Sequence, residues 1–78
     1  MRLAGILGAN VRRLRKAAGL SQEGLAAMVG VDMRYLGGIE RGQENPSLAV
    51  LEQTAKALKV SVVALLSEPG KGTQPKAE

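Results

Sequence analysis

Two arginines and two glycines share one face of a short predicted helix, and no other part of the chain carries a comparable group of functional side chains. At about 100° per residue, this face comprises Arg34, Gly37, Gly38 and Arg41, with Met33 and Tyr35 at its edges. A face that is cationic and low in profile can bind a polyanion closely, and the groove of a nucleic acid duplex is a natural partner. A solvated helix face is the alternative interpretation, and the face alone does not decide between the two.

The elements that position this face are two short helices joined by a tight turn, over residues 22–41. Apolar residues at helical spacing end at Val29, and Gly30 suits a turn residue at positive φ. Asp32 can cap a second helix, whose buried side includes Leu36. This pattern predicts a helix-turn-helix unit.

The composition excludes several classes of function. The chain has 78 residues and is 45% hydrophobic, so we expect one small domain with a single core, which must be aliphatic because Tyr35 is the only aromatic residue. The absence of Cys and His removes disulfides, thiolate metal sites, the usual general base and the commonest metal ligand. No paired carboxylates or phosphate-binding loop are visible. We therefore expect no enzyme, no metal and no cofactor.

Positive charge is concentrated near the start of the chain. The net charge is +4, but residues 1–20 hold four arginines, one lysine and no acid, which gives that segment +5. Such a segment beside a helix-turn-helix favours contact with a phosphate backbone, although simple solubility is an alternative. No membrane-spanning or targeting segment is predicted.

Five helices are predicted in all. The first covers residues 3–18, with an apolar face formed by Leu3, Leu7, Val11, Leu14 and Ala18. The fourth ends near Lys59 and has an inner stripe formed by Leu48, Leu51, Ala55 and Leu58, and a short fifth helix ends at about Leu66. Four polar residues precede apolar-periodic runs and are the expected N-caps, namely Ser21, Asp32, Ser47 and Ser61. We expect a helix-turn-helix domain over residues 1–67 and a disordered tail over residues 68–78.

The segments RRLRKAAGLSQEGLAAMVGV, IERGQENPSL and AKALKVSVVALL together resemble the phage-repressor and Cro-type helix-turn-helix family, also called the xenobiotic-response-element family. The likeness runs from about Asn10 to Leu66. It implies an all-α, five-helix, lambda-repressor-like domain that binds double-stranded DNA as a homodimer on an inverted repeat. Bacterial and phage members include repressors, antitoxins and controller proteins of restriction–modification systems, so a cytoplasmic location is implied as well, at the nucleoid when bound.

The resemblance also implies roles for individual residues. Arg15 and Glu40 match a structural salt bridge between the first and third helices, and Gln22 matches a glutamine that meets a phosphate and braces the recognition helix. The positions matching base-reading side chains are Met33, Arg34 and Gly38. The positions expected near the DNA backbone are Asp32, Tyr35, Gln43 and Asn45, and on charge grounds Arg12, Arg13 and Arg41.

Several of these roles have alternatives. Met33 could meet a thymine methyl group or pack against the second helix, and Tyr35 could donate to a phosphate, cover the core edge, or do both. Gly38 could let the recognition helix sit deeper in the groove or be a gap in the readout, so sequence choice is expected to depend heavily on Arg34.

The leading functional hypothesis is a sequence-specific transcriptional regulator, most simply a repressor, with no small-molecule effector. Dimerisation is expected through Val62, Val63 and the loop near Asn45. The alternative hypothesis is an antitoxin or adaptor that acts mainly through a protein partner, and the missing side chains at Gly37 and Gly38 are the observation in its favour.

Overall fold

The computed structural model describes residues 2–68, so the predicted tail lies, apart from Glu68, outside the described residues. Within residues 2–68 the fold is all-α with five helices, as predicted, and none of these helices is both long and apolar enough to cross a membrane. The helices are α1 (Arg2–Ala17), α2 (Gln22–Val29), α3 (Met33–Glu40), α4 (Leu48–Leu58) and α5 (Val62–Leu66).

Each of the four predicted N-caps is confirmed. The side-chain oxygen of each cap accepts a hydrogen bond from a backbone N–H in the first turn of its helix, a group that would otherwise lack a partner. The bonds run to Ser21 from Gly24 (2.9 Å), to Asp32 from Arg34 (2.7 Å), to Ser47 from Val50 (3.2 Å) and to Ser61 from Ala64 (3.0 Å).

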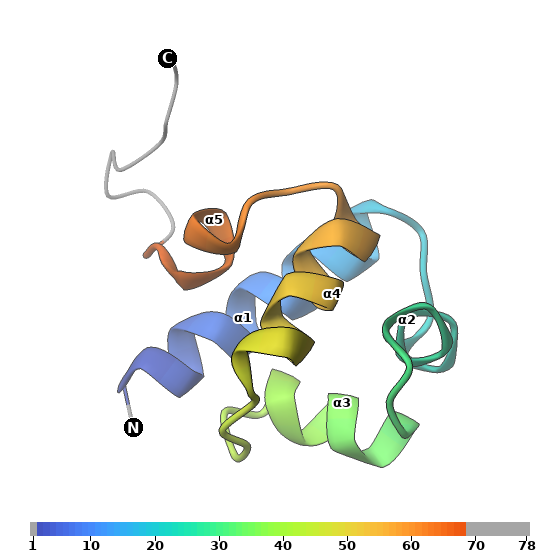
Figure 1. Ribbon diagram of the computed structural model, residues 1–78, viewed down its shortest axis with the longest axis horizontal. Helices are drawn as coiled ribbons and strands as arrows, with labels where there is room; N and C mark the ends of the chain where they lie inside the picture. Colours follow the sequence, from blue (N-terminus) through green and yellow to red (C-terminus); the bar gives the residue numbers. More distant parts are fainter. Residues whose placement is uncertain (1, 69–78) are drawn as a thin grey trace.

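The helices enclose one aliphatic core, and α3 lies at its outer edge. The α1 helix packs on α3 and α5, while α2 packs on α3 and α4. In Figure 1, α3 runs along the lower edge of the molecule, with the other helices above or beside it. One side of α3 is therefore buried and the other faces outward. The core residues are Leu7, Val11, Leu25, Ala26, Val29, Leu36, Ile39, Leu51, Ala55, Leu58 and Leu65.

Two leucines expected in the core are exposed instead. Leu48 is 77% exposed and Leu3 is 47% exposed, because both lie in the first turns of their helices, beyond the region where α1 and α4 pack on the other helices. The inner stripe of α4 is completed by Thr54, which is 2% exposed and donates its hydroxyl to the Val50 carbonyl oxygen at 2.7 Å. That hydrogen bond satisfies the polar group and allows its burial.

Asn10, a polar residue within the apolar face of α1, ties that helix to the end of α5. Its side chain is fully buried, and its amide donates to the carbonyl oxygens of Leu65 and Ser67, both at 2.8 Å. Carbonyl groups at a helix C-terminus lack partners within the helix, so Asn10 caps α5 from outside.

The backbones of α1 and α3 approach closely at Gly8. A Cβ atom at this position would collide with the Ile39 carbonyl oxygen and lie 2.6 Å from the Glu40 carbonyl oxygen. Any other residue would push α1 away from the C-terminal end of α3. The position of Gly8 therefore requires the absence of a side chain.

We expect Gly8→Ala to destabilise the protein by about 2 kcal/mol, in the range of an overpacked core, despite the better helix propensity of alanine. The matched control is Gly5→Ala on the same helix, where an added Cβ would meet nothing within 4 Å. The free energy of unfolding of that variant should rise by roughly 0.5–1 kcal/mol. Denaturant unfolding of both variants measures these changes. An equal rise in the free energy of unfolding of both variants would contradict the requirement for glycine where α1 crosses α3.

Candidate nucleic-acid interface

The outward side of α3 presents some of the residues expected to read DNA. Met33 is 47% exposed and Arg34 is exposed, so both side chains can reach a ligand in front of the helix. Asp32 is exposed as well, but its carboxylate also caps the helix. Tyr35 is half-buried and packs against the core, which corresponds to the core-edge role considered for its ring.

Gly37 and Gly38 do not form the open surface that the helical wheel indicated. Both are buried. A Cβ at Gly37 would lie 3.1 Å from Arg41 Nη1 and 3.7 Å from Gln22 Nε2, and a Cβ at Gly38 would lie 2.7 Å from Glu44 Cγ. The expectation of a bare, low face is therefore wrong, because side chains from neighbouring segments fold over both glycines. The surface offered in front of Gly38 belongs to Glu44.

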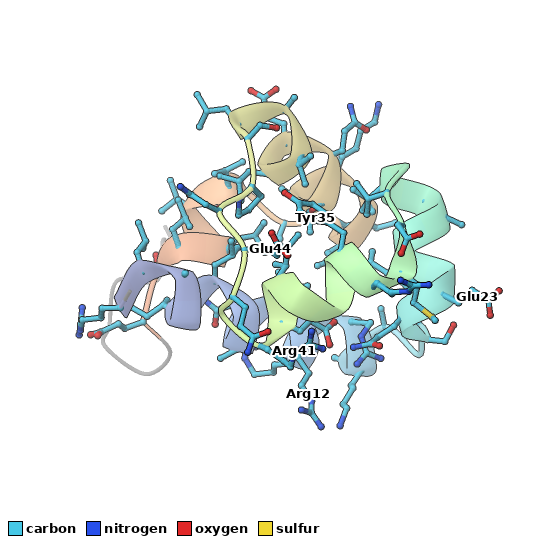
Figure 2. All side chains as sticks on the ribbon, turned by 90° about the horizontal axis from the view of Figure 1, so that it is seen from below. Arg12, Glu23, Tyr35, Arg41 and Glu44 are labelled. Carbon is cyan, nitrogen blue, oxygen red and sulfur yellow. The ribbon has the colours of Figure 1, made fainter. Side chains whose placement is uncertain are left out.

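Basic side chains border one long edge of α3. Figure 2, which looks onto α3 from below, shows Arg41 and Arg12 on one side of the helix and Glu44 and Tyr35 on the other. Both arginines are exposed, and Arg41 Nε donates to Gln43 Oε1 at 3.2 Å. The two sides of the helix thus differ in charge, which gives the interface a defined polarity.

The remaining expected backbone ligands lie in the loop after α3 and on α1. Gln43 and Asn45 are exposed in the loop between α3 and α4. Arg13 is exposed on α1, where its Nη2 donates to Asn10 Oδ1 at 3.1 Å. Arg13 therefore supports the side chain that caps α5, a role that its charge did not indicate. Contact of these residues with phosphate stays a prediction.

A polar network fixes α3 to α1 and α2. Arg15 Nε donates to Glu40 Oε2 at 2.7 Å and Arg15 Nη2 donates to Glu40 Oε1 at 3.1 Å, so the predicted interhelical salt bridge is present and bidentate. Gln22 Nε2 donates to the same Glu40 Oε1 at 2.9 Å, and Arg15 Nη1 donates to the Leu20 carbonyl oxygen at 2.9 Å. Gln22 thus braces α3 from α2, as the resemblance implied.

The network shifts the ionisation of both charged members. Burial alone would raise the pKa of Glu40, but the hydrogen bonds from Arg15 and Gln22, together with the positive charge of Arg15, outweigh burial and hold that pKa below its ordinary value. The hydrogen bond to Glu40 likewise raises the pKa of Arg15. Both groups are therefore charged in the folded protein at neutral pH.

Glu44 lies at this candidate interface, and the sequence patterns did not indicate its position. The helical wheel assigns Gly38 to a face of α3 but contains no information about which loop side chain covers it. The only available signal was the adjacent pair Gly37 and Gly38, which leaves room for a neighbour to fold over a helix.

We expect Glu40→Gln to lower the free energy of unfolding by about 3 kcal/mol at pH 7, because it leaves the buried Arg15 charge without a counter-ion. The pKa of Glu40 is lower in the folded chain than its ordinary value of 4.5, so its stabilising contribution is complete above that value. The contribution is lost as the pH falls through the lower folded pKa. Thermal unfolding from pH 7 to pH 2 should thus show the wild-type and variant curves converging in acid.

Glu52→Gln is the matched control, since it neutralises an exposed acid on α4. Its curve should follow that of the wild type. A constant gap between Glu40→Gln and the wild type across the whole pH range would contradict the assigned pKa shift.

Comparison with known proteins agrees with this geometry. The control protein C.SmaI of Serratia marcescens is 43% identical over 70 residues, covering 90% of this chain and 83% of its own. Among solved structures, the restriction-modification controller protein C.AhdI from Aeromonas hydrophila superposes with a TM-score of 0.79 at 43% identity, over 83% of this chain and 98% of its own. The master regulator for biofilm formation SinR, solved in complex with DNA, gives a TM-score of 0.74 at 40% identity, over 78% of this chain and 98% of its own.

The sequence model of the helix-turn-helix family matches residues 11–65. This range includes all of α2, α3 and α4 and the polar network that holds α3. With the relatives above, this match covers the elements on which the interface is built. The chain belongs to the helix-turn-helix family.

Proposed function

We propose that this protein is a transcriptional regulator that binds double-stranded DNA sequence-specifically, and that it acts as a repressor in the bacterial cytoplasm. The observation that carries the proposal is the position of α3, which is braced from inside by Glu40 and presents Arg34 outward, with Arg12 and Arg41 along one edge. Arginine can make a bidentate contact with guanine O6 and N7, and the bordering arginines can contact phosphates. The relative solved in complex with DNA supports the same use of the fold.

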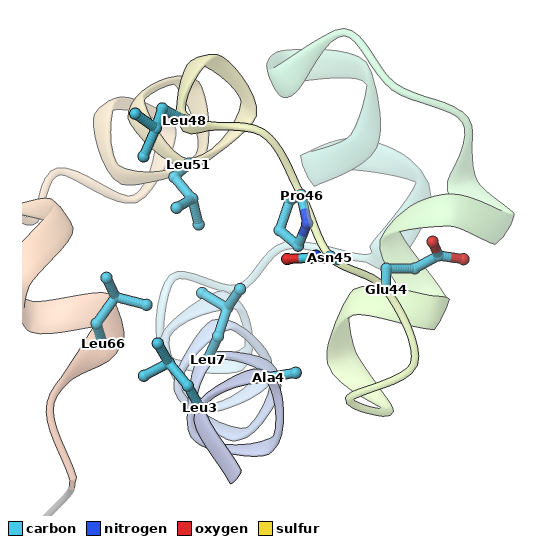
Figure 3. Close-up of a pocket in the computed structure, with 9 residues that line it drawn as sticks. All are labelled: Leu3, Ala4, Leu7, Glu44, Asn45, Pro46, Leu48, Leu51 and Leu66. Carbon is cyan, nitrogen blue, oxygen red and sulfur yellow. The ribbon is translucent and has the colours of Figure 1, made fainter. Parts of the chain in front are cut away.

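Binding as a homodimer on an inverted repeat is part of the proposal. A single domain of this size contacts too little DNA for tight specific binding. The candidate contact surface is apolar. Val63 is 65% exposed on α5, and a hollow of about 260 Å³ opens between α1, the loop before α4, α4 and α5 (Figure 3). Leu3 and Leu48, both exposed, line this hollow together with Leu66.

The protein-interaction alternative is not proposed, because the relatives are transcriptional regulators and controller proteins.

Selection of bound duplexes from a random pool at near-physiological salt tests DNA recognition. We expect a two-fold symmetric motif with half-sites about one helical turn apart. Arg34→Ala should reduce the preference for one guanine in each half-site roughly 5- to 150-fold, since a bidentate base contact is worth about 1–3 kcal/mol. Lys56→Ala, which removes an exposed positive charge from α4, is the control and should keep the motif. No enriched motif, with binding that vanishes as salt rises, would mean attraction to the backbone alone.

Sedimentation velocity tests the dimer. We expect Val63→Glu to convert a dimer into a monomer and to weaken operator binding, because burying an unpaired charge in an apolar contact is unfavourable. Met28→Glu is the matched control, since Met28 is 54% exposed on α2, away from the hollow, and should leave the dimer intact. An unchanged dimer in Val63→Glu would remove α5 from the interface.

A further inference from the structure

Glu44 occupies the space beside Gly38 that a side chain at position 38 of α3 would otherwise fill. A Cβ on Gly38 would lie 2.7 Å from Glu44 Cγ and 2.9 Å from Glu44 Oε2, so the acidic side chain lies directly on the helix backbone. Figure 3 shows Glu44 directed away from the apolar hollow and toward α3. The absence of a side chain at Gly38 therefore leaves room for the carboxylate of a residue in the following loop.

The backbone fixes this position of Glu44. Gly42 adopts a φ of +76°, which turns the chain back after α3. The Gln43 N–H then donates to the Gly38 carbonyl oxygen at 2.8 Å, and this bond holds the loop beside the helix. Glu44 is the next residue along the chain, and its side chain lies alongside Gly38.

The carboxylate lacks a partner within the part of the chain that the structure describes. None of the hydrogen bonds or ion pairs among residues 2–68 involves Glu44. Phosphates would repel this charge, so its position at a nucleic-acid interface calls for a donor. In the major groove the donors are the exocyclic amino groups of cytosine and adenine, and glutamate accepts from cytosine N4, whereas guanine presents only the acceptors O6 and N7.

We propose that Glu44 is a specificity-determining residue that reads cytosine through N4 at the base pair facing Gly38 and rejects guanine there by repulsion between acceptors. This inference rests on the proposed DNA-binding function. It assigns the readout at that position to the loop rather than to α3, beside the guanine contact of Arg34. The Glu44 side chain takes the place of the base-contacting side chain that Gly38 lacks, so the recognition surface has no gap at this position.

The experiment uses the full chain and the operator obtained by selection, with all four bases placed in turn at each position of one half-site. Competition binding is measured for the wild type, Glu44→Ala, Glu44→Gln and Gly38→Ala. We expect Glu44→Ala to lose the preference for cytosine over guanine at one position, roughly 5- to 150-fold. Glu44→Gln should shift that position toward adenine, since glutamine pairs with adenine N6 and N7. All other positions should keep their preferences.

Gly38→Ala provides a second test that leaves the carboxylate in the protein. The added methyl group would displace the flexible Glu44 side chain, whose Cγ is the nearest atom, and alanine favours the helix by about 1 kcal/mol. We expect this variant to fold and to lose the same cytosine preference as Glu44→Ala. Glu52→Ala, which removes an exposed acid from α4, is the control and should leave every base preference unchanged.

The outcomes separate this inference from the function beneath it. A wild-type protein that selects no motif overturns both. A wild-type motif that Glu44→Ala preserves at every position overturns the assignment of Glu44 alone. A uniform rise in the affinity of Glu44→Ala for all sequences, with the motif intact, also overturns it, since the carboxylate would then only repel phosphates.

Discussion

The arrangement of this domain depends on the buried ion pair between Arg15 and Glu40. The side chains of Arg15 and Glu40 are 10% and 3% exposed, and the hydrogen bonds of the network join α1 and α2 to α3, and α1 to the turn before α2. Two buried charges stabilise a fold only when their geometry is good and their remaining donors and acceptors are satisfied. Gln22 and the Leu20 carbonyl group supply those contacts, so the network fixes the orientation of α3 and does not merely add stability.

Close packing around this network requires small residues. A core without Phe or Trp is thin, and α1 reaches Glu40 because Gly8 lets the two backbones approach. Gly38 has the same property on the opposite side of α3, where the neighbour is a loop side chain. Helix propensity is thus lost at Gly8 of α1 and at Gly38 of α3, and α3 gains contacts on both of its sides.

Much of this fold could be predicted from local patterns. The four N-caps and the five helices follow from cap residues and apolar periodicity, and the ion pair between Arg15 and Glu40 follows from the resemblance. Periodicity assigned Leu48 to the buried stripe of α4 and Gly38 to an open face, and both assignments were wrong. A helical wheel places a residue on a face, but the length over which two helices pack and the path of a loop are long-range properties. Glu44 covers Gly38 because of the turn at Gly42, which lies on no helical face.

The base contacts proposed for this protein come from two places, α3 and the loop that follows it, and this has a physical consequence for specificity. Residues of α3 share their helix with the buried network and core, so their substitutions act on stability and recognition together. Glu44 is half-buried on a loop whose position depends on backbone hydrogen bonds to α3 and on one glycine, so its side chain can change with little cost to the core. A base-contacting side chain on a loop that is held against a rigid helix has a fixed position, and its residue type can change without disturbing the helix. Placing recognition at the junction of α3 and its following loop thereby separates the choice of base from the stability of the fold.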